Sequence, residues 1–172
     1  MNGFPSGLHR AEVLERFASA MGHEMVMEQL EAEKKRKQEE YEENKWKGYR
    51  SCRLVITKIE CIDQDDYTGS DRLWIYGFPN NNRDYFEEEI YISSGETKFL
   101  DLEVQFIGDC QGDVYLYIEE VDILGYGEIN DEIARVNESI QKYNPNVEYI
   151  KEFKNEKEGI HYKIGLKVVP RK

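Results

Sequence analysis

The sequence changes character at Gly48, and this change limits the possible fold more than any other feature. Before it, residues 31–47 consist largely of strong helix formers with opposite charges four residues apart, such as Glu31 and Lys35. From Tyr49 onward, short runs rich in β-branched and aromatic residues are separated by Gly, Pro, Asn and Asp. We therefore predict a helical extension over residues 1–48 and a β-built domain over residues 49–172.

The extension carries apolar residues mostly three and four positions apart, which is typical of one stripe on an amphipathic helix. These residues are Leu14, Phe17, Met21, Met25 and Leu30. We interpret them as a surface that docks onto a partner protein or onto copies of the chain. A helix packed on its own domain and a disordered segment are the alternatives. The basic tetrad Lys34–Lys37 does not favour nucleic acid, because acidic residues flank it on both sides.

The second part of the chain contains seven or eight segments with the composition of strands. They run from Tyr49 to Cys61, Leu73 to Tyr76, Tyr85 to Ile92, Phe99 to Phe106, Val114 to Val121, Val147 to Phe153 and Ile160 to Val169. The run from Val114 alternates best, with Leu116 and Ile118 on one face and Tyr115 and Tyr117 on the other. Many strands joined by short turns predict a mainly β fold, an antiparallel β-sandwich.

One helix is expected inside this β domain, near residues 130–143. Asn130 has the character of an N-cap, and apolar residues follow at spacings of three, four and three. They are Ile133, Val136, Ile140 and Tyr143. The Asn144–Pro145 pair would end this helix.

Two clusters of acidic residues suggest a binding end. Four carboxylates fall within nine residues between two predicted strands, namely Asp63, Asp65, Asp66 and Asp71. Glu120 and Asp122 are two apart near the end of another strand, so an extended backbone projects both to one side. If the clusters meet, a hard cation such as Ca²⁺ would relieve their repulsion. The alternative is a solvated loop without metal.

The same segments resemble a known family. Asp63 to Tyr76, as D-x-D-D-x-x-G-S-D-x-L-W-I-Y, is similar to the first calcium loop of C2-type domains, the calcium- and lipid-binding β-sandwiches. Tyr117 to Glu128 is similar to their other acidic loop, and Gly159 to Val169 to the last strand of small bacterial versions. The resemblance covers residues 50–172 and implies that Asp65 or Asp66, Asp71, Glu120 and Asp122 share one or two Ca²⁺ ions. It departs from the family at Glu120, where Asp is commoner.

The charge and the cysteine content limit the expected partners and the expected compartment. The chain has a net charge of −12, of which residues 51–172 carry −11, so nucleic acid is not an expected partner of the β domain. Cys52, Cys61 and Cys110 are odd in number and lack a CxxC spacing, which predicts free thiols in a reducing compartment, the cytoplasm. The start shows no leader pattern, and no segment approaches the ~20 apolar residues of a membrane span.

No catalytic pattern is present. The three histidines, His9, His23 and His161, belong to no HExxH motif, and the chain has neither GxSxG nor a phosphate-binding glycine loop. We therefore predict a non-enzymatic binding or assembly module, Ca²⁺-responsive and equipped with a docking helix. One alternative is a structural subunit of a large intracellular or viral assembly without metal. Another is a Ca²⁺-dependent membrane-associating domain, which the acidic body and the lack of a polybasic strand disfavour.

Overall fold

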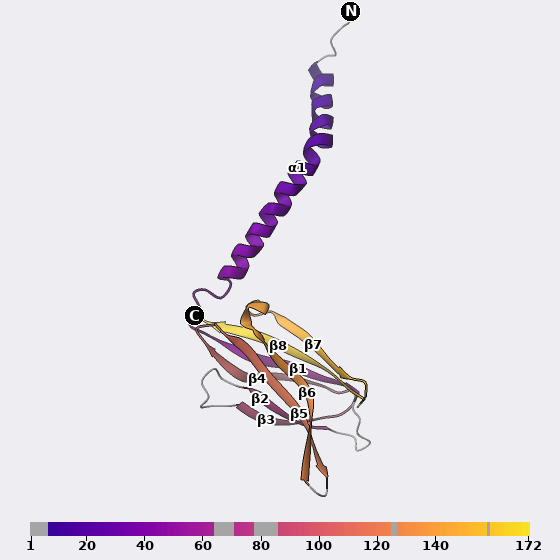
Figure 1. Cartoon of the computed structure of the whole chain (residues 1–172), viewed down its shortest axis with the longest axis vertical. Coiled ribbons are helices and arrows are strands. Elements are labelled where there is room, and N and C mark those ends of the chain that lie inside the picture. Colours follow the sequence, from indigo (N-terminus) through magenta and orange to yellow (C-terminus); the bar gives the residue numbers. More distant parts are fainter. Residues whose placement is uncertain (1–6, 64–70, 78–85, 125–126, 158) are drawn as a thin grey trace, which may run out of the picture. The chain divides into compact units, whose positions relative to one another are not determined.

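The structure is a computed structural model that describes residues 7–63, 71–77, 86–124, 127–157 and 159–172. It divides the chain into two compact units, Met1–Asn44 and Lys45–Lys172. Figure 1 shows the helix of the first unit and the strands of the second. Each unit is described by itself below.

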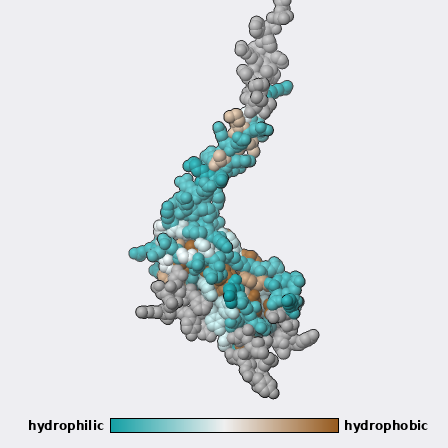
Figure 2. Space-filling view, in the orientation of Figure 1, coloured by the Kyte–Doolittle hydropathy of each residue, from teal (hydrophilic) through white to brown (hydrophobic). Residues whose placement is uncertain are grey.

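The first unit is the helix α1, Gly7–Asn44. Ion pairs between residues four apart hold its charged half: Glu33–Lys37 at 2.9 Å, Lys35–Glu39 at 3.8 Å and Arg36–Glu40 at 3.9 Å. Figure 2 shows a hydrophilic face along most of the described helix, with a small hydrophobic group in it. The side chains of Leu14, Phe17 and Met21 lie outside the described residues, so the predicted apolar stripe stays a prediction.

The second unit is a sandwich of two four-stranded antiparallel sheets (Figure 1). One sheet has the strand order β4-β1-β8-β7 and the other β3-β2-β5-β6. The strands are β1 Ser51–Asp63, β2 Asp71–Gly77, β3 Phe86–Ile92, β4 Thr97–Gly108, β5 Asp113–Leu124, β6 Gly127–Ser139, β7 Glu148–Asn155 and β8 Ile160–Arg171. The predicted antiparallel β-sandwich is confirmed.

Alternation along the strands builds the core, because successive side chains point to opposite faces of a sheet. In β2, Leu73 and Ile75 are buried while Trp74 and Tyr76 are half-buried on the outer face. The inner residues of both sheets form one cluster with Trp46, which follows α1 in the chain. The Lys45 ammonium beside it donates to the Gln141 carbonyl. Residues 45–46 therefore belong to the sandwich, not to a separate linker.

The helix predicted near residues 130–143 is wrong. Residues up to Ser139 form β6, and only Ile140–Lys142 make a helical turn, the 3₁₀-helix η1. Asn130 is paired in mid-strand with Val121. The register runs from Ile118 opposite Ala134 to Glu119 opposite Glu132, so Ile133 is an extra residue in a bulge. The bulge shifts the strand alternation by one residue and so gives apolar spacings typical of a helix.

The expectation of three free thiols is also wrong. Cys52 at the start of β1 forms a disulfide with Cys110 in the turn between β4 and β5. Asp109 and Cys110 in that turn both have positive φ, at 57° and 46°. Cys61 is free and buried, and burial raises the pKa of its thiol. The argument for a reducing compartment loses its basis, since it depended on Cys52 and Cys110 being unpaired.

The described residues contain no helix with the length and apolar content that a bilayer crossing requires.

Candidate functional site

The predicted calcium ligand Asp71 lies inside the sandwich. It is the first residue of β2, and it points inward with Leu73 and Ile75 at a relative exposure of 2%. The Tyr162 hydroxyl of β8 donates a hydrogen bond to its Oδ2. Burial and the hydrogen bond to Asp71 raise the pKa of Tyr162, so the phenol stays protonated and remains a donor. Asp71 thus joins the two sheets rather than facing a solvent-accessible ion.

Glu120 has the same orientation. It follows Leu116 and Ile118 on the inner face of β5 and is 4% exposed. It pairs in register with Leu73, two residues along β2 from Asp71. Asp71 and Glu120 therefore lie near each other on the inner face of one sheet, whereas the meeting of the two acidic clusters as wholes stays a prediction.

The remaining candidates are scattered or outside the described residues. Asp63 is exposed at the end of β1, while Asp65 and Asp66 lie outside the described residues. Asp122 is not in a loop, because β5 runs to Leu124 and pairs with β6 in a hairpin in which Asp122 opposes Ile129. Its side chain is not among those described.

No group of three or more His, Cys, Asp or Glu side chains that could hold a metal occurs in the part of the chain that the structure describes. The donor set expected for Ca²⁺, six to eight oxygens around one point, does not form from Asp63, Asp71 and Glu120. The calcium prediction now depends on Asp63, Asp65, Asp66 and Asp122, and it stays a prediction.

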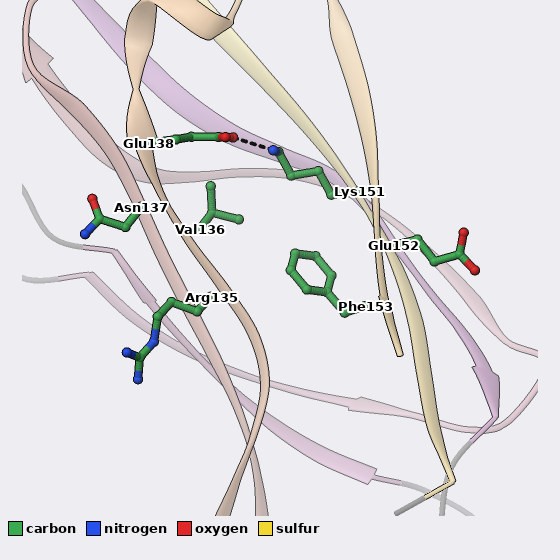
Figure 3. A pocket seen from close by; sticks show the side chains of 7 residues that line it. All are labelled: Arg135, Val136, Asn137, Glu138, Lys151, Glu152 and Phe153. Atoms are coloured by element: carbon green, nitrogen blue, oxygen red, sulfur yellow. Dashed lines mark ion pairs between the residues drawn. The ribbon is translucent and has the colours of Figure 1, made fainter. Parts of the chain in front are cut away.

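A cavity of about 350 Å³ lies between the edge strands β6 and β7, which we call the seam groove. Its lining residues are Arg135, Val136, Asn137 and Glu138 of β6 and Lys151, Glu152 and Phe153 of β7. Figure 3 shows Val136 and Phe153 pointing into the space between the strands, whereas Arg135, Asn137 and Glu152 point away from it. The groove therefore has an apolar floor and a charged rim.

A polar clamp closes one end of the seam groove and links the two sheets. The Glu138 carboxylate pairs with the Lys151 ammonium, accepts the Tyr143 hydroxyl, and lies 3.4 Å from Lys142 Nζ. Lys151 also lies 5.6 Å from the centre of the Tyr143 ring. Burial alone would raise the pKa of Glu138, but Lys151, Tyr143 and Lys142 outweigh it, so the pKa is lowered.

The outer face of the β3-β2-β5-β6 sheet carries a row of aromatic and guanidinium groups. Arg72 lies 5.3 Å from the Trp74 ring, Trp74 and Tyr76 are 6.2 Å apart, Tyr76 and Tyr117 are 6.2 Å apart, and Arg135 lies 5.2 Å from Tyr117. Such stacks stabilise a sheet surface by cross-strand contact. The row ends at Arg135, on the rim of the seam groove.

Chemically, the seam groove is suited to binding. None of its seven lining residues is Ser, Cys or His, and its principal acid, Glu138, is already neutralised by Lys151. A second cavity of about 380 Å³ includes Asp63 and His161 at the end of β1 and β8. There the His161 imidazole contacts Glu152, and none of the lining residues is Ser, Thr or Cys.

Sequence reasoning missed the seam groove because it depends on strand order. Residues 135–138 and 151–153 line one cavity only because β6 and β7 end up at the same side of two different sheets. The inward orientation of Asp71 and Glu120, by contrast, was available from alternation, since each continues an apolar face.

Comparison with known proteins gives a likeness in structure only. No family model matches the sequence, and no curated protein matches it. The chain is similar to a structure of CC2D1B, described as coordinating ESRCT-III activity during the mitotic reformation of the nuclear envelope, with a TM-score of 0.45 and 11% identity. It is also similar to human GIVD cytosolic phospholipase A2 bound to an inhibitor and terbium chloride, at 0.42 and 12%. The C2 domain A of plant extended synaptotagmin 1 follows at 0.41 and 8%.

The aligned region covers 72–73% of this chain in each case. It spans 57% of the CC2D1B chain and 18% of the phospholipase chain, but 95% of the plant C2 domain. A C2 domain is thus among the structures that the chain is similar to, as the sequence resemblance led us to expect. At this similarity no activity or ligand of those proteins is carried over.

Proposed function

We propose that the chain is a non-enzymatic binding and assembly module whose helix α1 joins it to a second copy of itself. The observation that carries this proposal is the exposure of four adjacent apolar residues on α1. Met25, Val26, Met27 and Leu30 have relative exposures of 63%, 54%, 44% and 46%. Val26, Met27 and Leu30 are spaced by three and four, so they share one side of the helix.

The charge pattern of α1 favours a second copy as the occupant. An acidic block, Glu24 to Glu33, precedes the basic tetrad Lys34–Lys37, and a second acidic block, Glu39 to Glu43, follows it. Two parallel helices in register would place like blocks side by side. Two antiparallel helices that cross near residue 32 place the tetrad of each opposite residues 27–30 of the other, which include Glu28.

The same arrangement covers the apolar residues. Opposite Met27 and Leu30 it places residues 34–37, whose long aliphatic stems cover apolar surface while their charged ends remain in water. Each exposed ion pair contributes only about 0.3–0.5 kcal/mol, so the association is weak and concentration-dependent. The intrahelical pairs of Lys35, Arg36 and Lys37 can exchange partners at little cost, because their side chains are 67–79% exposed.

Sedimentation equilibrium of the full chain at several concentrations tests this. We expect a monomer–dimer equilibrium that the double variant M27E/L30E abolishes. Q29E/Q38E adds the same two charges at exposed polar positions of the same helix and is the matched control, expected to keep the dimer. Self-association is overturned if the wild-type chain stays monomeric at every concentration, or if Q29E/Q38E dissociates as readily as M27E/L30E. If α1 instead forms a complex with a different protein, that protein and not a second copy of the chain is the partner.

Calcium is not needed for this function, because Asp71 and Glu120 face the core. We expect Ca²⁺ at ~1 mM to shift the unfolding midpoint of the full chain by less than ~1 °C, since little binding means little stabilisation of the folded state. A rise of several degrees that a chelator reverses would support the Ca²⁺-responsive module predicted from the sequence, with Asp63, Asp65, Asp66 and Asp122 as the remaining candidate ligands.

A further inference from the structure

The four edge strands of the sandwich differ in how they discourage pairing with another chain. The edge strand β3 is short, at seven residues, and β7 has eight residues with Lys151 and Lys154 among them. β4 is interrupted by two register shifts against β1. Short length, lysines and bulges are the usual protections of a sheet edge.

The edge strand β6 lacks these protections along its second half. It is 13 residues long and contains neither lysine nor proline. After the bulge at Ile133, its pairing with β5 continues without interruption from Ala134 opposite Ile118 to Ser139 opposite Asp113. In the part of the chain that the structure describes, no strand pairs with its other edge. Along this regular stretch of six residues, the backbone N–H and C=O groups of alternate residues point away from β5 and towards the open edge.

The seam groove follows this same stretch. Four consecutive residues, 135–138, line it, so the cavity runs along the backbone edge and not along one face of the strand. A strand added there would place alternate side chains towards Val136 and Phe153, the two residues that point into the groove in Figure 3. The volume of the seam groove, about 350 Å³, is at the lower end of the usual range for ligand sites. It is large enough for one apolar side chain of an added strand.

Charge decides what kind of segment fits. The strand β6 carries Glu128, Asp131, Glu132 and Glu138 against the single cation Arg135, and residues 51–172 as a whole carry −11. A second copy of β6 would bring the same excess of acid. We infer that β6 binds an extended, lysine- or arginine-bearing segment of another protein by strand addition, with one apolar side chain in the seam groove.

A synthetic peptide tests the inference on the full-length chain. The probe is an acetylated, amidated nonapeptide in which lysine alternates with valine and leucine occupies the centre; a second probe has glutamate in place of every lysine. We expect the lysine peptide to shift the backbone amide resonances of residues 134–139 and to slow their hydrogen exchange. The glutamate peptide binds at least about tenfold more weakly, because β6 as a whole and the domain around it carry a net negative charge.

Variants locate the site. N137K places a positive charge on the proposed edge, and T97K adds the same charge to the edge strand β4 of the other sheet. We expect N137K to weaken binding of the lysine peptide about fivefold or more and T97K less than twofold, with unchanged unfolding midpoints for both. The inference is overturned if the lysine peptide does not bind at ~1 mM or binds N137K as well as wild type. It is also overturned if the resonance shifts map to another strand, or if both peptides bind with equal affinity.

Discussion

The helix α1 and the sandwich are stabilised in opposite ways. On α1, interactions are local, between residues four apart, and the charged side chains are more than half exposed. In the sandwich, β1 pairs with β8, whose residues are about a hundred positions further along the chain, and both strands bury most of their inner side chains. Single changes should therefore be costly at a few interior positions of the sandwich and nearly neutral on α1. The predictions below test this contrast, starting with the largest effect.

The largest effect is expected at Gly77 of β2, which approaches Val104 of β4 in the other sheet. A Cβ at Gly77 would lie 1.5 Å from the carbonyl oxygen of Val104 in β4, so the backbones would have to separate. We expect G77A to lose more than about 4 kcal/mol of unfolding free energy or to fail to fold. Thermal unfolding followed by the fluorescence of Trp46 and Trp74, which both belong to the sandwich, measures this.

Gly108 provides the control for this prediction. It also ends a strand, β4, and a Cβ there would meet nothing within 4 Å. G108A should remain within about 0.5 kcal/mol of wild type. If both variants unfold at the same midpoint, the close approach of the two sheets at Gly77 is not a constraint on the fold.

Second in size is the disulfide. Cys52 and Cys110 are 58 residues apart, and closing a loop of that length lowers the entropy of the unfolded chain by an amount worth about 4 kcal/mol at 25 °C. We expect the C52A/C110A variant to unfold at markedly lower urea concentration than the oxidised wild type, and a reductant to lower the wild-type midpoint. C61A removes the buried free thiol and is the control. A reductant should lower its unfolding midpoint by the same amount as that of the wild type.

The sign of the pH dependence can be derived for Glu138. Its pKa is lowered from 4.5 in the folded state by Lys151, Tyr143 and Lys142, despite burial. The charged carboxylate therefore stabilises the fold fully above pH 4.5, and this contribution is lost as the pH falls through the folded-state pKa. E138Q should cost about 1–2 kcal/mol at pH 7 and progressively less below pH ~4.

The control for Glu138 lies on the same strand. Glu132 pairs with Arg135 but is 42% exposed, against 16% for Glu138. E132Q should change stability by less than about 0.5 kcal/mol at any pH. A cost for E132Q as large as that for E138Q would mean that the net charge of β6, and not the clamp, determines the effect.

The contrast between local and long-range interactions also explains what could be predicted from the sequence. The strands were found because alternation is a local signal: Leu116 and Ile118 on one face of β5 are visible in the sequence and buried in the structure. The β6 strand was missed because the bulge at Ile133 breaks that alternation. The Cys52–Cys110 disulfide and the seam groove join residues that no local pattern relates.

The candidate calcium site shows that the position of an acidic residue in the sequence does not by itself give the direction of its side chain. Counting carboxylates located Asp71 and Glu120 at one end of the sandwich, which is where they lie. Their number did not reveal their orientation. The apolar residues two positions away, Leu73 and Ile118, did indicate it, because period-two alternation places Asp71 and Glu120 on the buried face.

The smallest effect is expected on α1, and it tests whether the helix and the sandwich are stabilised independently. E33Q removes the charge that faces Lys37 at 2.9 Å on an exposed helix surface but keeps a similar helix propensity. It should lower the helical circular dichroism signal slightly, corresponding to about 0.3–0.5 kcal/mol, because it removes one i,i+4 pair. The free energy of unfolding reported by tryptophan fluorescence should not change, because Trp46 and Trp74 both belong to the sandwich. A change of that free energy by more than ~1 kcal/mol would show that α1 stabilises the sandwich directly, and the contrast between the two units would no longer hold.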